Sequence, residues 1–208
     1  MTVLKRTLIT LTSLTTLAYA GGSCDLSQYG DVKVNWTSYK TPLKIGVNGS
    51  FNKVDYVAAA PVGKNFREIL VGSTVTIDTA SVDSNNEGRD ATLLNAFFKK
   101  MVGEAIHAKI VDIKAQKVKR GEPKVGVVTL QVRMNDIAKR VPMRYRFKDG
   151  LLKANGNIDL ADFNALGALG TLNKACFDLH DGKTWSDVTI GFEMKISALL
   201  CHPDEIKQ

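Results

Sequence analysis

The chain has 208 residues, of which 44% are hydrophobic and 24% are charged, and its formal net charge is +7. This composition fits one globular domain with a substantial core. The basic residues alternate with apolar ones or form short clusters such as 117–120, without the continuous stripe and interleaved aromatic residues typical of nucleic-acid binding. We therefore expect no nucleic-acid partner, and at most a transient contact with an anionic membrane surface.

The first twenty residues have the layout of a secretory signal peptide. Lys5 and Arg6 precede a modestly apolar run, and Ala18 and Ala20 supply the small residues before a cleavage site. The run is shorter than the roughly twenty apolar residues that a membrane-spanning helix needs. We expect cleavage after Ala20, which leaves residues 21–208 as a single exported domain, periplasmic or secreted.

Alternation of apolar and polar residues recurs along most of the remaining chain and predicts β-strands. The best example is 141–148, where every second residue is apolar and the residues between them include Arg144 and Arg146. The dipeptide Asp149-Gly150 follows, and it suits a type I′ hairpin turn because both positions tolerate positive φ. Eight strands are expected, at 32–37, 43–54, 73–78, 106–110, 128–134, 141–148, 151–159 and 188–196.

Two short helices interrupt this pattern. Apolar residues recur at helical spacing within 93–101, after Arg89 and Asp90, and Asp90 is placed to cap that helix. A second helix is expected over 160–169. The segment 170–187 is long for a connection between strands, which makes it a candidate lid or rim.

Eight mostly antiparallel strands joined by short turns can close on themselves, which removes the exposed edges of an open sheet. We therefore predict an all-β fold with two short helices, built as a closed eight-stranded antiparallel β-barrel. The interior of such a barrel is either filled by side chains or wide enough for one small ligand, and the inward-facing residues leave both alternatives open. A hollow interior would select a long hydrocarbon chain, because each buried methylene contributes roughly 0.8 kcal/mol against an association cost of roughly 4–15 kcal/mol.

Three cysteines, Cys24, Cys176 and Cys201, remain after cleavage, in a compartment where disulfides persist. The first and last strands of an up-and-down barrel pair antiparallel, so Cys24 before the first strand and Cys201 after the last should meet at one end. We expect a disulfide between them, worth about 4–5 kcal/mol from chain entropy, with Cys176 as the spare thiol. The sequence has no Cys-x-x-Cys and its histidines are scattered, so no metal site is expected.

Four short segments have an order and spacing that are similar to the motifs of one family. They are Val47–Phe51, Val75–Asp83, Arg89–Phe98 and Gly156–Phe163. On these motifs the mature region resembles the YceI-like family of secreted polyisoprenoid-binding proteins, whose fold is an extended lipocalin-like barrel; Leu160 departs from the family, which often has Arg there. The resemblance implies a barrel that holds a polyisoprenoid, an isoprenoid quinone, or a fatty acid or amide, with no cofactor besides the bound lipid.

The candidate ligand-lining residues are large apolar side chains of the inward faces, the helices and the following loop: Trp36, Val47, Val75, Phe97, Phe98, Ile110, Leu130, Met143, Tyr145, Phe147, Phe163, Phe177, Phe192 and Met194. Arg89 and Asp90 are the most distinctive polar pair. The favoured interpretation is a structural anchor, in which Asp90 caps the helix and Arg89 pairs with a carboxylate such as Asp78 or Asp83. The alternative is a polar mouth that hydrogen-bonds a ligand headgroup.

The leading hypothesis is a non-enzymatic periplasmic carrier of a long apolar lipid. The first alternative is a stress-related periplasmic interaction protein with a filled core. The second is a small hydrolase that uses Cys176 and His180, although their spacing does not establish a catalytic pair and the sequence has no G-x-S-x-G elbow. A homodimer is left open.

Overall fold

The computed structural model describes residues 23–202, so the predicted signal peptide at 1–20 lies outside the described residues. Within this range the main element is one antiparallel sheet of ten strands. They are β1 (Ser23–Lys40), β2 (Ile45–Phe51), β3 (Val54–Val57), β4 (Thr74–Asp78), β5 (Val82–Asp83), β6 (Ala105–Ala115), β7 (Lys124–Met134), β8 (Ile137–Lys148), β9 (Leu151–Asp159) and β10 (Asp187–His202). The helices of the same range are α1 (Phe66–Leu70), α2 (Glu87–Ala96) and α3 (Leu166–Ala175), with the 3₁₀ helices η1 (Thr79–Ser81), η2 (Phe98–Lys100), η3 (Leu160–Phe163) and η4 (Asp178–His180).

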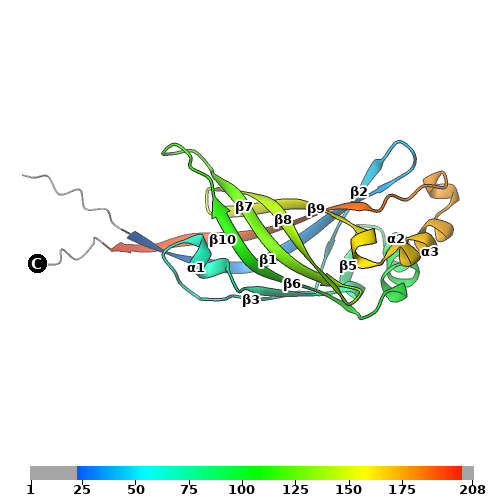
Figure 1. Cartoon of the computed structure of the whole chain (residues 1–208), viewed down its shortest axis with the longest axis horizontal. Helices are drawn as coiled ribbons and strands as arrows, with labels where there is room; N and C mark the ends of the chain where they lie inside the picture. The colour runs from blue at the N-terminus through cyan, green and yellow to red at the C-terminus, as the bar shows by residue number, and fades with distance from the viewer. Residues whose placement is uncertain (1–22, 203–208) are drawn as a thin grey trace, which may run out of the picture.

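The sheet is a curled half-barrel with the strand order β3-β4-β6-β7-β8-β9-β10-β1-β2-β5 (Figure 1). The all-β class is confirmed, but the predicted closed barrel of eight strands is wrong. The expected strand over 43–54 is interrupted at Asn52 and Lys53, which separate β2 from β3, whereas the expected strand over 73–78 is present as β4 and is separated by η1 from the additional two-residue strand β5. Asp78 stabilises η1, because its side chain accepts a hydrogen bond from the backbone N–H of Ala80 at 2.9 Å. The short pieces then pair separately, β2 with β5 and β3 with β4.

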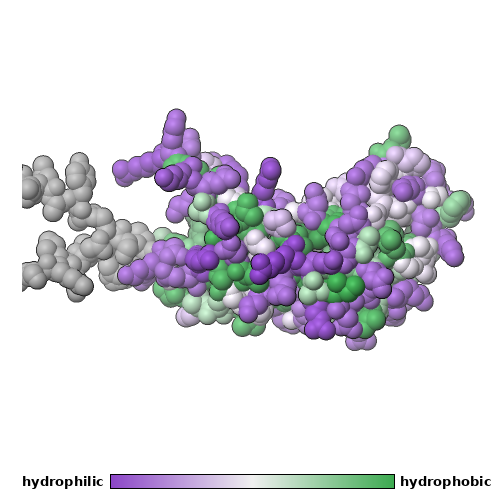
Figure 2. Space-filling model, viewed as in Figure 1, coloured by the Kyte–Doolittle hydropathy of each residue, from purple (hydrophilic) through white to green (hydrophobic). Residues whose placement is uncertain are grey.

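The strands β7 and β8 confirm the predicted alternation. Buried and exposed residues alternate along β7 and β8, and Arg144 and Arg146 point outward from β8. Hydrophilic side chains accordingly cover much of the face seen in Figure 2. The turn between β8 and β9 is also as expected, since Asp149 and Gly150 have φ values of +51° and +76°. The inner face of the sheet therefore carries the apolar residues and the outer face the charges.

The two ends of the half-barrel are covered by different helices (Figure 1). At one end α1, which the sequence analysis did not predict, buries Ile69 and Leu70 completely. The ring of Phe66 at the start of α1 packs edge-on against Tyr145 and Phe147, with ring centroids 6.1 and 5.0 Å apart. At the other end lie α2 and α3 with their adjoining 3₁₀ helices. The α1 end is thus plugged by aromatic packing.

The predicted helices differ from the observed ones in their boundaries. α2 begins at Glu87, and its N-cap is Asn86, whose side chain accepts a hydrogen bond from the backbone N–H of Arg89 at 2.8 Å. The prediction that Asp90 caps this helix is therefore wrong. The second predicted helix is divided at Asn164, which has a φ of +52°, between η3 and α3. Part of the predicted 170–187 loop is helical, because α3 continues to Ala175.

The first and last strands pair antiparallel, and their register makes Cys24 and Cys201 direct Cα partners. Antiparallel Cα partners lie about 4.5–5.5 Å apart, a separation that a disulfide can bridge. The side chains of both residues lie outside the described part of the chain, so the disulfide itself stays a prediction. Cys176 is a free, half-buried thiol.

Candidate functional site

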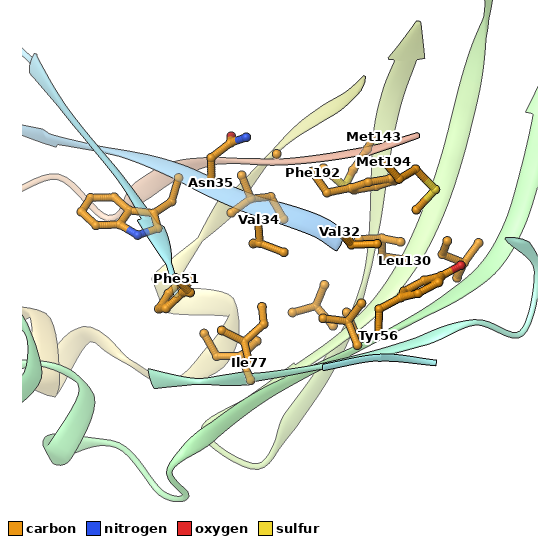
Figure 3. Close-up of a pocket in the computed structure, with 18 of the residues that line it drawn as sticks. Val32, Val34, Asn35, Phe51, Tyr56, Ile77, Leu130, Met143, Phe192 and Met194 are labelled. Carbon is orange, nitrogen blue, oxygen red and sulfur yellow. The ribbon is translucent and has the colours of Figure 1, made fainter. Parts of the chain in front are cut away.

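Two adjoining cavities lie on the concave side of the sheet. The outer chamber, of about 410 Å³, is bounded by strands and by the helices α2 and α3. The inner chamber, of about 110 Å³, lies deeper between the strands (Figure 3). Residues of a shared waist line both chambers: Trp36, Phe51, Ile106, Met134, Ile158 and Ile190. The outer chamber alone falls within the range of roughly 300–1,000 Å³ that is usual for small-molecule sites.

The wall of the inner chamber is almost entirely apolar. Figure 3 shows Val32 and Val34 of β1 and Ile77 of β4 reaching into the same space. Tyr56 also lines it, and its hydroxyl donates a hydrogen bond to Ser73 Oγ at 3.0 Å. Burial raises the pKa of Tyr56 above its usual value, and this hydrogen bond offsets part of the rise. The Tyr56 phenol is therefore neutral at physiological pH, and the chamber suits hydrocarbon.

The outer chamber combines an apolar interior with a polar rim. Leu93 of α2 and Leu169 of α3 contribute to its apolar part. Its rim includes three basic side chains, those of Lys40, Arg89 and His180. Among the residues that the structure describes, no Asp or Glu lines this chamber.

Arg89 and Asp90 are held by a hydrogen-bond network around the buried Ser84. Arg89 Nε donates to Ser84 Oγ at 2.7 Å, and Arg89 Nη2 donates to the Ser84 carbonyl at 2.6 Å. Asp90 accepts from the Ser84 backbone N–H at 2.9 Å and from its hydroxyl. The predicted pairing of Arg89 with Asp78 or Asp83 is wrong, because the guanidinium donates its hydrogen bonds to Ser84 instead. The carboxylate of Asp83 accepts hydrogen bonds from the Asn85 backbone N–H and the Asn52 side chain, and these lower its pKa. Arg89 both anchors α2 and lines the outer chamber.

The structure brings most of the predicted lining residues to the two chambers. Those that line a chamber are Trp36, Val47, Val75, Phe97, Phe98, Ile110, Leu130, Met143, Phe192 and Met194. Their contact with a ligand stays a prediction.

Four other predicted residues do not line either chamber. Tyr145 and Phe147 pack around Phe66 at the plugged end instead. Phe163, the last residue of η3, is buried in the core, and Phe177 is 58% exposed at the surface.

Sequence reasoning missed several residues of the walls. They include Val32, Val34, Tyr56, Ile77, Met134, Leu172 and Ile190. Val32 and Val34 share the strand face of Trp36, so the alternation in β1 was a usable signal. Tyr56 gave no such signal, because its strand is only four residues long. Lys40 was missed because it ends its strand, where a lysine usually faces solvent.

Cys176 and His180 also border the outer chamber, but their chemistry does not fit a hydrolase. Burial raises the pKa of the Cys176 thiol, which the charge of Lys40 only partly offsets, whereas a nucleophilic cysteine needs a lowered pKa. His180 Nδ1 is hydrogen-bonded to Thr184 Oγ1 at 2.8 Å, and burial together with Lys40 lowers its pKa. Within residues 23–202, no group of His, Cys, Asp and Glu is arranged to hold a metal ion.

Comparison with known proteins identifies the family. A family profile described as the YceI-like domain matches residues 28–198. The chain belongs to the YceI-like family. No curated protein sequence matches this YceI-like protein.

Solved structures show the same fold. A polyisoprenoid-binding domain from Saccharophagus degradans, implicated in plant cell wall breakdown, has 12% sequence identity and a TM-score of 0.58, with 86% of this chain and 99% of that chain covered. BcnA of Burkholderia cenocepacia has 17% identity and a TM-score of 0.54, with coverages of 80% and 96%. A mutant of the Campylobacter jejuni YceI protein has 21% identity and a TM-score of 0.50, with coverages of 74% and 85%. At these identities the likeness establishes the fold of this YceI-like protein.

Proposed function

We propose that this YceI-like protein is a non-catalytic carrier that holds one long apolar lipid chain in the two chambers. The observation that carries the proposal is the pair of chambers meeting at the waist, with an apolar wall that continues from the rim to the inner strands. The ligand classes that suit this space are a polyisoprenoid, an isoprenoid quinone, and a fatty acid or amide. The polyisoprenoid-binding domain from Saccharophagus degradans supports the first of these by its shared fold.

The distribution of polar groups gives the ligand a direction. The inner chamber offers almost no polar surface, so the end of the tail belongs there. The outer chamber has the basic and hydroxyl side chains, so the headgroup belongs there. Each methylene that leaves water on binding contributes roughly 0.8 kcal/mol, which makes chain length the main determinant of affinity.

We propose that the protein acts outside the cytoplasm, in the periplasm or after secretion. The pattern of residues 1–20, with Lys5 and Arg6 before an apolar run and Ala18 and Ala20 at its end, supports export. Residues 21–208 would then form one lipid-binding domain. No helix in the described range 23–202 is long and apolar enough to cross a membrane.

The direct test is native mass spectrometry of gently purified protein, paired with two substitutions on β6. Ala108 lines the inner chamber, whereas the neighbouring His107 is exposed on the outer face. We expect wild type and His107→Phe to carry a long-chain lipid, and Ala108→Phe to lose it because the new ring fills the inner chamber. Circular dichroism checks that both variants are folded. Wild-type protein that carries no lipid and takes up no chain offered to it would contradict the proposal.

One observation favours a second candidate, an interaction protein with a filled core. The inner chamber alone, at about 110 Å³, is smaller than usual ligand sites. If the core is filled and receives no tail, wild type and Ala108→Phe will both be free of lipid, and the same mass spectra decide between the two functions.

A further inference from the structure

The described lining of the outer chamber carries basic side chains and no acidic one. Lys40, at the end of β1, and Arg89, on α2, both line this chamber and are both half-buried. Among the described residues, neither side chain has a carboxylate oxygen within 4.0 Å, although eight other ion pairs occur in the same part of the chain. Asp90 reaches Arg89 only through the Ser84 hydroxyl and does not line the chamber, so the two cations face the cavity without a carboxylate in direct contact.

Both cations keep donors available for a ligand. A guanidinium has five N–H donors, and Ser84 accepts two of those of Arg89 while also fixing the orientation of the group. The ammonium of Lys40 has three donors. A planar, fixed guanidinium is well suited to bind a carboxylate or a phosphate through two parallel hydrogen bonds.

The field of Lys40 acts on the chamber wall. Burial raises the pKa of Cys176 and the charge of Lys40 opposes that rise, whereas burial lowers the pKa of His180 and the charge of Lys40 adds to that fall. Both residues border the chamber, from the C-terminal end of α3 and from η4. Half-buried cations without a partner are unfavourable, because they have lost part of their hydration without gaining an opposite charge. An anion bound in the chamber would restore that balance.

We propose that the outer chamber recognises an anionic headgroup, a carboxylate or a phosphate monoester, at the end of the lipid chain, through Lys40 and Arg89. This proposal rests on the proposed carrier function and narrows it. An anionic headgroup site predicts that acidic lipids bind more tightly than alcohols, amides and quinones with tails of the same length.

The test compares ligands that share a sixteen-carbon tail. Delipidated protein is titrated with hexadecanoic acid, hexadecyl phosphate and hexadecanol, and binding is followed by the fluorescence of Trp36 and Trp185, which line the outer chamber. We expect at least one of the two anions to bind tenfold or more tightly than the alcohol, with a preference that shrinks as salt is added. The two anionic arms show whether the site prefers the carboxylate or the phosphate.

Substitution of Lys40 is the second part of the test, because among the described residues its side chain forms no ion pair whose loss would disturb the fold. We expect Lys40→Gln to weaken binding of the preferred anion about tenfold and to leave hexadecanol unchanged, and Lys40→Arg to restore anion binding. Lys33→Gln is the matched control, since Lys33 lies exposed on the other face of β1.

The outcomes separate this inference from the function on which it rests. Equal binding of acid, phosphate and alcohol overturns the anionic headgroup and leaves the carrier function standing. Equal weakening of all three ligands in Lys40→Gln also overturns it. Failure of every chain to bind the wild type contradicts the carrier function itself.

Discussion

Substitution of Gly49 by alanine tests whether the waist joins the two chambers. Gly49 lies on β2 directly opposite Trp36 of β1, between the inward-facing Val47 and Phe51. A Cβ atom at Gly49 would lie 2.2 Å from Cζ2 of the Trp36 indole, whereas ordinary contacts begin at 3.4 Å. The ring must therefore retreat by about 1.2 Å, the difference between these two distances. Because the Cβ pushes from the sheet, the indole moves inward, into the waist.

The cost of this substitution has two parts. Overpacking typically destabilises a core by about 1–3 kcal/mol. Replacing glycine by alanine at a position whose φ allows it stabilises the fold by about 0.4–1 kcal/mol, because it lowers the conformational entropy of the unfolded chain. We expect Gly49→Ala to lose about 1–2 kcal/mol net, a fall in Tm of about 2–4 °C for each kcal/mol in a domain of this size.

The informative assay is the dependence of affinity on chain length. In wild type, each added methylene should tighten binding about fourfold until the tail fills the inner chamber. In Gly49→Ala this gain should stop at a shorter chain, because the displaced indole closes the waist. Gly46→Ala is the control, since a Cβ at Gly46 faces outward and comes no closer than 3.2 Å to Thr37. A chain-length profile of Gly49→Ala that matches wild type, with Trp36 fluorescence unchanged, would refute the joined-chamber reasoning.

Three further predictions concern the fold and its charges. Ser84→Ala removes the hydroxyl that accepts from Arg89, so unfolding in urea should show a loss of about 1–3 kcal/mol, and an unchanged midpoint would refute the anchor. Burial lowers the pKa of His180 in the folded protein, so its contribution to stability is complete above the unfolded pKa of about 6.5 and is lost as pH falls through the folded pKa. His180→Gln should therefore reduce the fall in Tm between about pH 7.5 and pH 5.5, and an identical fall in both proteins would contradict this. Non-reducing peptide mapping should join Cys24 to Cys201, and Cys24→Ser should cost about 4–5 kcal/mol; a peptide that joins either to the third cysteine would overturn the pairing.

The strands of the second half of the chain were predictable because their signal is local. In β7, β8 and β10 the apolar or polar character of a residue indicates which face of the sheet it occupies, and the large buried side chains of these strands are the ones that the alternation indicates. The turn at Asp149 and Gly150 was predictable for a similar reason, since both residues accept the positive φ that the turn requires.

The break in the expected strand 43–54 was not predictable from alternation. At Asn52 the pattern continues while the backbone bends, and the bend depends on hydrogen bonds between distant segments, such as that from Asn52 N–H to the Ser81 carbonyl at 2.9 Å. The helix α1 is five residues long, which is too short for helical periodicity to appear.

The same limit explains the mixed result at the candidate site. Alternation identifies which face a residue occupies, but not its height along the barrel. Tyr145 and Phe147 were assigned to the ligand because they share the face of Met143, yet they lie at the height where Phe66 plugs the sheet. The partner of Arg89 was likewise not predictable, because Ser84 carries no charge that would indicate an interaction with a guanidinium.

The position of a bound tail is the measurement that tests the carrier account most directly. A sixteen-carbon acid with a photoreactive diazirine at its far end would be bound, irradiated and mapped by peptide sequencing. The account predicts cross-links to the inner chamber, at residues such as Met143, Phe192 and Met194. Cross-links confined to exposed apolar residues outside both chambers, such as Leu43 and Val57, would place the tail on the surface and contradict it.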